Sequence, residues 1–286
     1  MQDYVIFTDT GADMPDSLLE ELGITAIPLN CFMKDDPAVT VSLRGKAFYD
    51  ELRAGKVACT SAANLSVFRD AFTEVLKQGK DILYFALSSG LSCMYATGKL
   101  AAEELSAEYP DRKIVAIDSL SVTLGQSLLV YLTAKKKAEG LSLDEAAAYA
   151  EEMKPCMMHW FTVDDLVFLK RGGRLSAVSA FAGTLLGIKP FLTVTAEGKL
   201  EAVEKQRGRR NAILSLLTHF DTECTDRSTP VFVAHADALE DAEQVKETLI
   251  NDYGAKEVIV GELGPIIGAH TGPGLVGIFY IGPARK

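Results

Sequence analysis

The chain of 286 residues is 48% hydrophobic and 24% charged, a balance typical of a globular protein with one large or two modest domains. Its 39 acidic and 29 basic residues give a formal charge of −10. This acidity argues against nucleic acid as a main partner, because neutralising a phosphate backbone needs clustered Lys and Arg.

In the first half of the chain, short apolar runs alternate with helical patterns. The predicted strands are 4–7, 25–29, 82–87 and 113–117, and the predicted helices are 16–22, 45–52, 65–77, 91–109, one ending near 137, and 142–154. Asn64 and a capping box at Ser142–Glu145 mark two helix starts. Residues 31–41 are expected to be an irregular loop. Alternation at this spacing indicates βαβ units and a parallel sheet.

After Pro155 the pattern changes. The predicted strands are 158–163, 191–194, 200–205, 231–234, 258–260 and 275–281, and the predicted helices are 209–220 and 241–253. Residues 196–198 are typical of a hairpin turn, and residues 181–191 are expected to be core. A hairpin among βα units indicates a mixed sheet. We therefore expect an α/β protein of two domains, residues 1–155 with the parallel sheet and residues 156–286 with the mixed one.

The cysteines, at 31, 59, 93, 156 and 224, are scattered and include no Cys-x-x-Cys pair. Such a set indicates reduced thiols and no metal site. The N-terminus lacks the basic and apolar regions of a signal peptide, and no apolar stretch is long enough to cross a bilayer. We expect a cytoplasmic protein without a membrane-spanning segment.

A serine-rich turn follows the predicted strand 82–87 and opens a long helix. Amide groups at such an edge can bind an anion, and the hydroxyls of Ser88, Ser89 and Ser92 could donate to it. Alternatively, Ser88 or Ser89 simply caps the helix. Ser92 falls just inside the predicted helix, where capping is weaker.

The segment Gly90-Leu-Ser-Cys-Met94 resembles the G-x-S-x-G nucleophile elbow except at its fifth position. Met94 replaces the glycine that the strained turn needs. No histidine lies in a recognisable triad context, so we favour a binding turn. An acyl or phosphoryl transferase or hydrolase that uses Ser92 or His270 is the alternative.

Residues 264–274 contain four glycines and two prolines around His270 and Thr271. Glycine permits close approach of the backbone to a ligand, and the two polar side chains would present a pair of donors. The alternative is a structural turn with a satisfied histidine. Binding of a small phosphorylated metabolite at this glycine-rich edge is another possible function.

Arg174 follows two glycines in the stretch 171–176, just ahead of a predicted helix, and suits an anion contact. A surface loop is the alternative. Lys205, Arg207, Arg209 and Arg210 form a basic cluster in an acidic protein. Such a cluster is usually a solvated face, although it could dock an acidic or phosphorylated partner.

Taken together, these stretches resemble the DegV family of bacterial fatty-acid-binding proteins across essentially the whole chain. The matching segments are Thr8–Pro15, Thr60–Ser61, Ser88–Ser92, Asp118–Ser119, Asp165–Arg174, Ile188–Pro190 and Gly268–Gly274. The resemblance implies a three-layer α/β/α parallel-sheet domain at 1–155 and a two-layer mixed α/β domain at 156–286. A long-chain, palmitate-like fatty acid would lie in the cleft between them.

The resemblance also implies roles for individual residues. Hydroxyls of Thr60 and Ser92 would hold the carboxylate of the fatty acid, with Ser61, His270 and Thr271 close by. Arg174 would help to pass the acyl group to a partner fatty acid kinase, which makes the acyl phosphate. The protein would be a carrier in lipid transport or phospholipid metabolism and not an enzyme, with no catalytic residue, metal or cofactor.

Two departures from the family pattern lie beside the expected head-group pocket. The family usually has Gly-Thr where this chain has Cys93-Met94, and Gln-Pro where it has Ala62-Ala63. Because Thr60 and Ser92 are kept, we expect these changes to affect which hydrocarbon chain the protein prefers more than they affect carboxylate binding.

Overall fold

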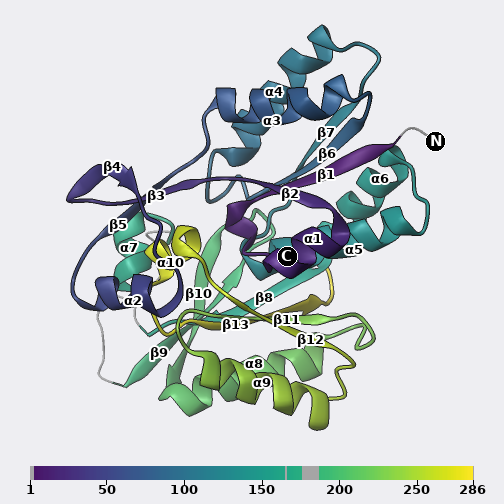
Figure 1. Cartoon of the computed structure of the whole chain (residues 1–286). Coiled ribbons are helices and arrows are strands. Elements are labelled where there is room, and N and C mark those ends of the chain that lie inside the picture. The colour runs from purple at the N-terminus through teal and green to yellow at the C-terminus, as the bar shows by residue number, and fades with distance from the viewer. Residues whose placement is uncertain (1–2, 165, 176–186, 286) are drawn as a thin grey trace.

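Figure 1 shows the computed structural model of the chain, which describes residues 3–164, 166–175 and 187–285. Asp165 and Ser176 of the predicted site region, and residues 181–186 of the predicted core segment, lie outside the described residues. The other end of that segment is core as predicted, because Phe191 is fully buried.

A parallel sheet is built from the first half of the chain. Its strands, in the spatial order β2-β1-β6-β7, are β1 (Tyr4–Asp9), β2 (Ile24–Ile27), β6 (Asp81–Ala86) and β7 (Ile114–Asp118). Helices α3 (Leu65–Lys77) and α4 (Met94–Glu108) cover one face, and α5 (Leu124–Ala138) and α6 (Leu143–Met153) lie on the other, with α1 (Asp16–Leu22) against β2 (Figure 1). The predicted parallel sheet between helices is confirmed.

Local capping explains why two of these helices begin where the sequence predicts. The Asn64 side chain accepts a hydrogen bond from the amide of Val67 at the start of α3. Ser142 and Glu145 form a reciprocal capping box at the start of α6. Each cap satisfies amide groups that the first helical turn leaves without a partner.

A small antiparallel sheet occupies the stretch that we expected to be an irregular loop. Its strands, in the order β4-β3-β5, are β3 (Asn30–Met33), β4 (Asp36–Thr40) and β5 (Ala58–Ser61). The expectation is therefore wrong for residues 31–41, although the tip at Lys34–Pro37 is exposed as predicted. Strand β4 contains Asp36 and Pro37, which strands usually avoid, and it forms nevertheless because an edge strand tolerates proline. Helix α2 (Gly45–Arg53) follows it, as predicted.

A six-stranded mixed sheet is built from the second half. Its strands, in the order β10-β9-β8-β13-β11-β12, are β8 (Met157–Thr162), β9 (Ile188–Val194), β10 (Leu200–Arg207), β11 (Val231–His235), β12 (Val258–Glu262) and β13 (Val276–Ile281). Strands β9 and β10 form the predicted hairpin, and β11 runs parallel to β12. Helices α8 (Arg209–Glu223) and α9 (Leu239–Asn251) pack side by side on this sheet (Figure 1). The predicted α/β fold with separate parallel and mixed sheets is confirmed.

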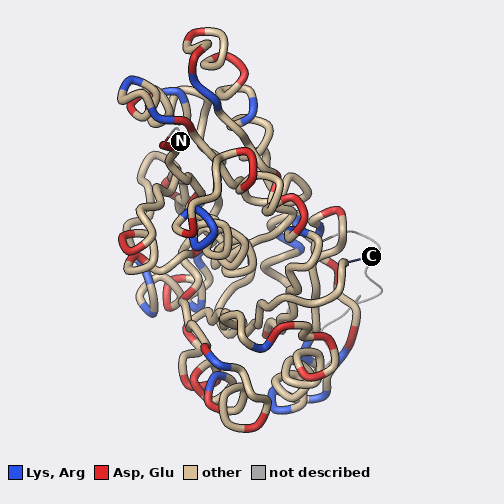
Figure 2. Tube along the Cα trace, turned by 90° about the vertical axis from the view of Figure 1, so that its right-hand side faces the viewer, with Lys and Arg blue, Asp and Glu red and all other residues tan. Residues whose placement is uncertain are grey.

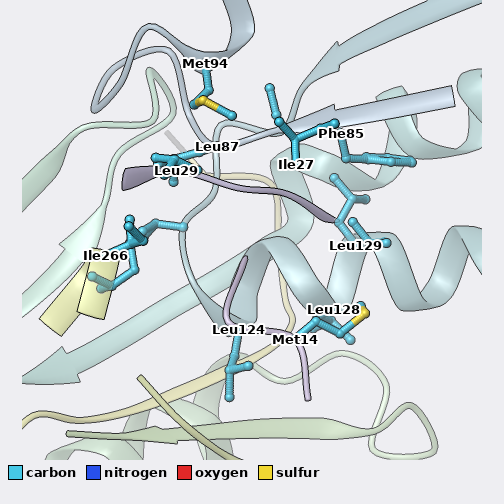
Figure 3. Close-up of a cluster of buried hydrophobic side chains, with 14 of the residues drawn as sticks. Met14, Ile27, Leu29, Phe85, Leu87, Met94, Leu124, Leu128, Leu129 and Ile266 are labelled. Atoms are coloured by element: carbon cyan, nitrogen blue, oxygen red, sulfur yellow. The ribbon is translucent and has the colours of Figure 1, made fainter. Parts of the chain in front are cut away.

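Helix α5 connects the two sheets. It contacts β8, β11 and β13 as well as α6, and ten of its fifteen residues are buried, so it has no broad solvent face. Gly125 permits this contact, because a Cβ atom there would clash with the buried ring of His159 on β8. Figure 3 shows part of the resulting core, to which β6, α5 and α10 contribute Phe85, Leu124, Leu128, Leu129 and Ile266.

The strands of the parallel sheet all precede residue 119, and the strands of the mixed sheet all follow residue 156. One apolar core nevertheless runs through α5 from the first sheet to the second. The division into domains at residue 155 therefore stays a prediction.

Acidic and basic residues alternate along the outer helices and loops in Figure 2. Many of them pair, as Arg69 does with Glu104 and Glu108. This mixed pattern differs from the clustered Lys and Arg that nucleic-acid binding needs. Within the described part of the chain, no helix is both long and apolar enough to cross a membrane.

Candidate functional site

One cavity brings together the side chains that we expected to surround a ligand. Its volume is about 110 Å³, and its wall includes Thr60, Ser61, Ser92, Arg174, His270 and Thr271. Most of the remaining wall is apolar and includes Leu29, Leu87, Val122, Phe161, Ile267 and Phe279. Hydroxyl, imidazole and guanidinium groups thus gather in a space lined by hydrocarbon, an arrangement that suits a molecule with a polar head and an apolar body.

Thr60 and His270 form the central polar contact of the cavity. Thr60 lies near the end of β5, and its Oγ1 is 2.7 Å from Nε2 of His270. Nδ1 of His270 is buried and has no hydrogen-bond partner among the described residues. It faces Gly172, where a Cβ atom would clash with the ring. The imidazole is therefore held by one hydrogen bond and by close packing.

His270 is neutral at neutral pH in this structure. Burial lowers the pKa of His270 to about 4, and the nearby cation of Arg174 acts in the same direction. The ring then carries one N–H group. When that N–H is on Nε2 it donates to Thr60 Oγ1, and the hydroxyl hydrogen of Thr60 is free for a ligand. We expected His270 to donate to the ligand directly, whereas here its Nε2 is bonded to Thr60.

Ser92 lies in the turn before α4 and not inside the helix, so our expected helix start is wrong. Helix α4 begins at Met94, and the amide of Met94 donates to Ser92 Oγ at 3.4 Å. The turn is wound more tightly than a helix start because the amides of Leu91 and Ser92 both donate to the carbonyl of Ser88 at 3.0 Å. This turn directs Ser92 to the cavity wall.

The other two serines of the turn have structural positions. Ser88 is fully buried, and its hydroxyl donates to the carbonyl of Gly198 at 2.7 Å, which fastens the turn to the β9–β10 hairpin. Ser89 is exposed, and its amide donates to Asp118 Oδ1. The amides of residues 88–92 all donate within the protein, so the expected backbone site for an anion is wrong. The expectation that the Ser88 hydroxyl donates to an anion is also wrong, because this hydroxyl donates to Gly198.

His270 and Thr271 lie in the last turn of a helix, α10 (Pro265–Thr271), where we expected a glycine-rich loop. The start of α10 follows a known pattern, since Gly264 caps it and Pro265 occupies its first position. This start signal was present in the sequence, but the number of glycines around it favoured a loop. Thr271 lines the cavity, but its hydroxyl donates to the carbonyl of Ile267 at 3.2 Å. Because Nε2 of His270 is bonded to Thr60, neither member of the expected pair of donors is directed at a ligand.

Arg174 follows α7 (Val167–Gly172), and the helix that we expected after it would begin outside the described residues. Its Nε donates to the carbonyl of Leu91 at 3.3 Å, and its Nη1 donates to the carbonyl of Gly172 at 2.5 Å. These bonds connect α7 to the serine turn and hold the guanidinium in the cavity wall. Arg174 is therefore half-buried and not part of an exposed loop.

Arg209, one residue of the basic cluster at positions 205–210, has a structural role. Arg209 donates to Asp241 at 2.7 and 2.9 Å and to the carbonyl of Gly274 at 2.5 Å. It thus secures the segment that follows α10. Arg207 and Arg210 are exposed.

The contacts give no support to catalysis by Ser92. The hydroxyl that contacts His270 belongs to Thr60, and Ser92 has no histidine partner among the described residues. The fifth residue of the elbow-like segment, Met94, is buried at the start of a helix. No group of three or more potential metal ligands occurs in the described part of the chain.

The sequence analysis did not identify the residues of the apolar wall. Phe161 and Phe279 come from neighbouring strands, β8 and β13, and line the cavity beside residues of the parallel-sheet half. In the sequence they look like any buried strand residue. Only the pairing of distant strands distinguishes them.

Comparison with known proteins identifies the family. A model of the DegV family, described as uncharacterised proteins, matches residues 3–282. A DegV domain-containing protein of Clostridium perfringens is 39% identical over 290 residues, which cover 100% of both chains. A solved structure from Thermus thermophilus, described by fatty acid binding of a DegV family protein, is 26% identical with a TM-score of 0.89 and covers 99% of this chain and 100% of its own.

DegV from Bacillus subtilis, described as a fatty acid binding protein, is 28% identical with a TM-score of 0.86. It covers 99% of this chain and 100% of its own. The resemblance seen in the sequence is confirmed, and the chain belongs to the DegV family.

Proposed function

We propose that this protein binds a long-chain fatty acid, with the carboxylate at Thr60 and Ser92 and the hydrocarbon chain along the apolar wall. The observation that carries the proposal is the Thr60–His270 contact of 2.7 Å inside a cavity whose wall is mostly apolar. The relatives from Thermus thermophilus and Bacillus subtilis, both described as binding fatty acids, support it.

The polar groups have different parts in this proposal. Thr60, oriented by His270, donates its hydroxyl to the carboxylate, and Ser92 is the second donor. The guanidinium of Arg174 adds a positive charge to the same wall. Ser61 is exposed and assists at the rim, while Thr271 contributes mainly its methyl group, because its hydroxyl is bonded to Ile267.

Affinity comes mainly from the hydrocarbon chain. A charge-assisted hydrogen bond contributes about 1.5–3 kcal/mol. Burial of one methylene contributes about 0.8 kcal/mol, so that roughly 14 methylenes contribute about 11 kcal/mol before ordering costs. The hydroxyls therefore orient the ligand, and the chain holds it.

The cavity between the described residues is small for such a ligand. Its volume of about 110 Å³ is below the roughly 150 Å³ of an engineered cavity that binds benzene. It has room for the head group and the first methylenes, so we expect the apolar walls to separate when a palmitate-like chain enters.

We further infer that the protein is a carrier without catalytic activity, which presents the carboxylate to a fatty acid kinase in lipid transport or phospholipid metabolism. Arg174 would assist this hand-over, and its place in the cavity wall, with Nε and Nη1 bonded to backbone carbonyls, supports a role in the hand-over more than in holding the carboxylate. All five cysteines are unpaired, which supports a cytoplasmic location.

Mass spectrometry and calorimetry test the proposal. The gently purified protein should release a fatty acid, and palmitate should bind stoichiometrically. Thr60→Ala with Ser92→Ala should weaken binding by about 3–6 kcal/mol, because two charge-assisted bonds are lost. Ser89→Ala is the matched control, since Ser89 belongs to the same turn but does not line the cavity. Equal affinity of the double variant and the control would place the carboxylate elsewhere.

A further inference from the structure

The two segments that carry Thr60 and Ser92 are connected by an unusual hydrogen bond. The amide of Ala63 donates to Sδ of Met94 at 3.3 Å. Ala63 follows β5 by two residues, and Met94 is the first residue of α4. The bond therefore joins the end of the strand that holds Thr60 to the helix start that follows Ser92.

This bond is buried. Ala63 is 3% exposed and Met94 is fully buried. A buried amide needs a partner, and the thioether of Met94 is the acceptor that the described residues offer to Ala63. A methionine sulfur is a weak acceptor, but a flexible side chain can reach an amide that a shorter one cannot.

Met94 acts from behind the cavity wall. In Figure 3 its side chain lies near Leu87 and Leu29, both of which line the cavity, whereas Met94 itself does not. A ligand in the cavity therefore contacts residues such as Leu87 and Leu29, which Met94 supports from behind, and does not contact Met94 itself. Its influence on binding must pass through their positions.

Ala63 and Met94 belong to the two residue pairs, Ala62-Ala63 and Cys93-Met94, at which the sequence resemblance implies a departure from the family pattern. A proline at position 63 would have no amide hydrogen, whereas alanine has one. Met94 provides the acceptor that this additional donor requires. The two departures therefore complement each other in space, although they are 31 positions apart in the sequence.

We propose that the Ala63–Met94 hydrogen bond is a brace that fixes the distance between the hydroxyls of Thr60 and Ser92, and so sets the preference for a carboxylate head group. The proposal rests on the proposed fatty-acid binding. Ala63 and Met94 are positioning residues. A carboxylate uses both hydroxyls at once and needs their spacing, whereas an alcohol of the same chain length can bind through one of them.

The test compares palmitate with 1-hexadecanol, each displacing a fluorescent fatty acid. Met94→Leu keeps the volume of the side chain and removes the acceptor. We expect it to weaken palmitate about tenfold and 1-hexadecanol less than twofold. Ala63→Pro in the Met94→Leu background removes the unpaired amide but does not replace the hydrogen bond, so stability should recover while the preference for palmitate stays low, and a restored preference would overturn the brace. Met14→Leu is the control, because Met14 is buried in the same core and its sulfur accepts no hydrogen bond from the described residues.

Hydrogen exchange provides a readout that needs no ligand. The amide of Ala63 should exchange at least tenfold faster in Met94→Leu than in the wild type, and at the wild-type rate in Met14→Leu. An unchanged exchange rate, or an equal loss of affinity for both ligands, overturns the brace. If the wild type itself fails to bind palmitate, the proposed function is wrong, and the exchange rate still decides whether the hydrogen bond exists.

Discussion

Replacement of Thr60 by valine probes both the site and the stability of the protein. Valine has the shape of threonine without the hydroxyl, so that Nε2 of His270 loses its partner at 2.7 Å. Nδ1 already lacks a partner in the described structure, and the ring would then be buried with both nitrogens unpaired. A buried polar group without a partner costs about 1–3 kcal/mol, so the free energy of unfolding should fall by that amount.

The same substitution should weaken ligand binding. Loss of one charge-assisted bond of about 1.5–3 kcal/mol corresponds to an affinity for palmitate that is roughly 10- to 150-fold lower. Thr60→Ser keeps the hydroxyl and should stay within about threefold of the wild type. Urea unfolding measures stability, and calorimetric titration with palmitate measures affinity.

These two measurements separate the possible roles of Thr60. If the valine variant is destabilised but binds palmitate as well as the wild type does, Thr60 only supports His270 and does not hold the carboxylate. A variant unchanged in both measurements would refute the reasoning, because the contact would then contribute to neither property.

Three further predictions concern Arg174, Ser92 and Asp13. Arg174→Ala should bind palmitate nearly as well as the wild type but fail in acyl phosphate formation with a cognate kinase. Because the substitution removes a nearby cation, it should also raise the pKa of His270 from about 4, which NMR titration can follow. Ser92 should not be labelled by fluorophosphonate probes, and stoichiometric labelling that His270→Ala abolishes would instead show a nucleophile. Burial raises the pKa of Asp13 to about 7, although Asp13 accepts hydrogen bonds from Thr123 and Gly264. Since this pKa is above the unfolded value, the stabilising contribution is present below pH ~4 and is lost as the pH rises to ~7. Relative to Asp13→Asn, the wild type should lose on the order of 4 kcal/mol over that range in urea unfolding, and a constant difference would contradict the assignment.

The fold was predictable where the signals are local. Alternating apolar runs identified the strands of the parallel sheet, and Asn64 and Ser142 marked helix starts through their caps. The prediction failed where partners that are distant in the sequence decide the conformation. Residues 36–40 form a strand because β3 offers an edge, although Asp36 and Pro37 argue against one.

The residues that share the cavity were predictable as a set, whereas their contacts were not, and their role in binding stays a prediction. The family resemblance named six residues, and one cavity contains all of them. It could not tell that Thr60 pairs with His270, 210 positions away, or that Ser88 is bonded to Gly198, 110 positions away. Such contacts depend on how the small sheet packs on α10 and how the serine turn packs on the β9–β10 hairpin, and no local pattern in the sequence encodes that packing.

The position of α5 has a consequence for fragments of this protein. The helix precedes residue 155, yet one side of it covers β8, β11 and β13. A fragment of residues 1–155 would expose that apolar side, and a fragment of residues 156–286 would leave the facing strands uncovered. Each piece should aggregate when expressed alone, and the two should become soluble together by co-folding, as in a split-protein complementation pair.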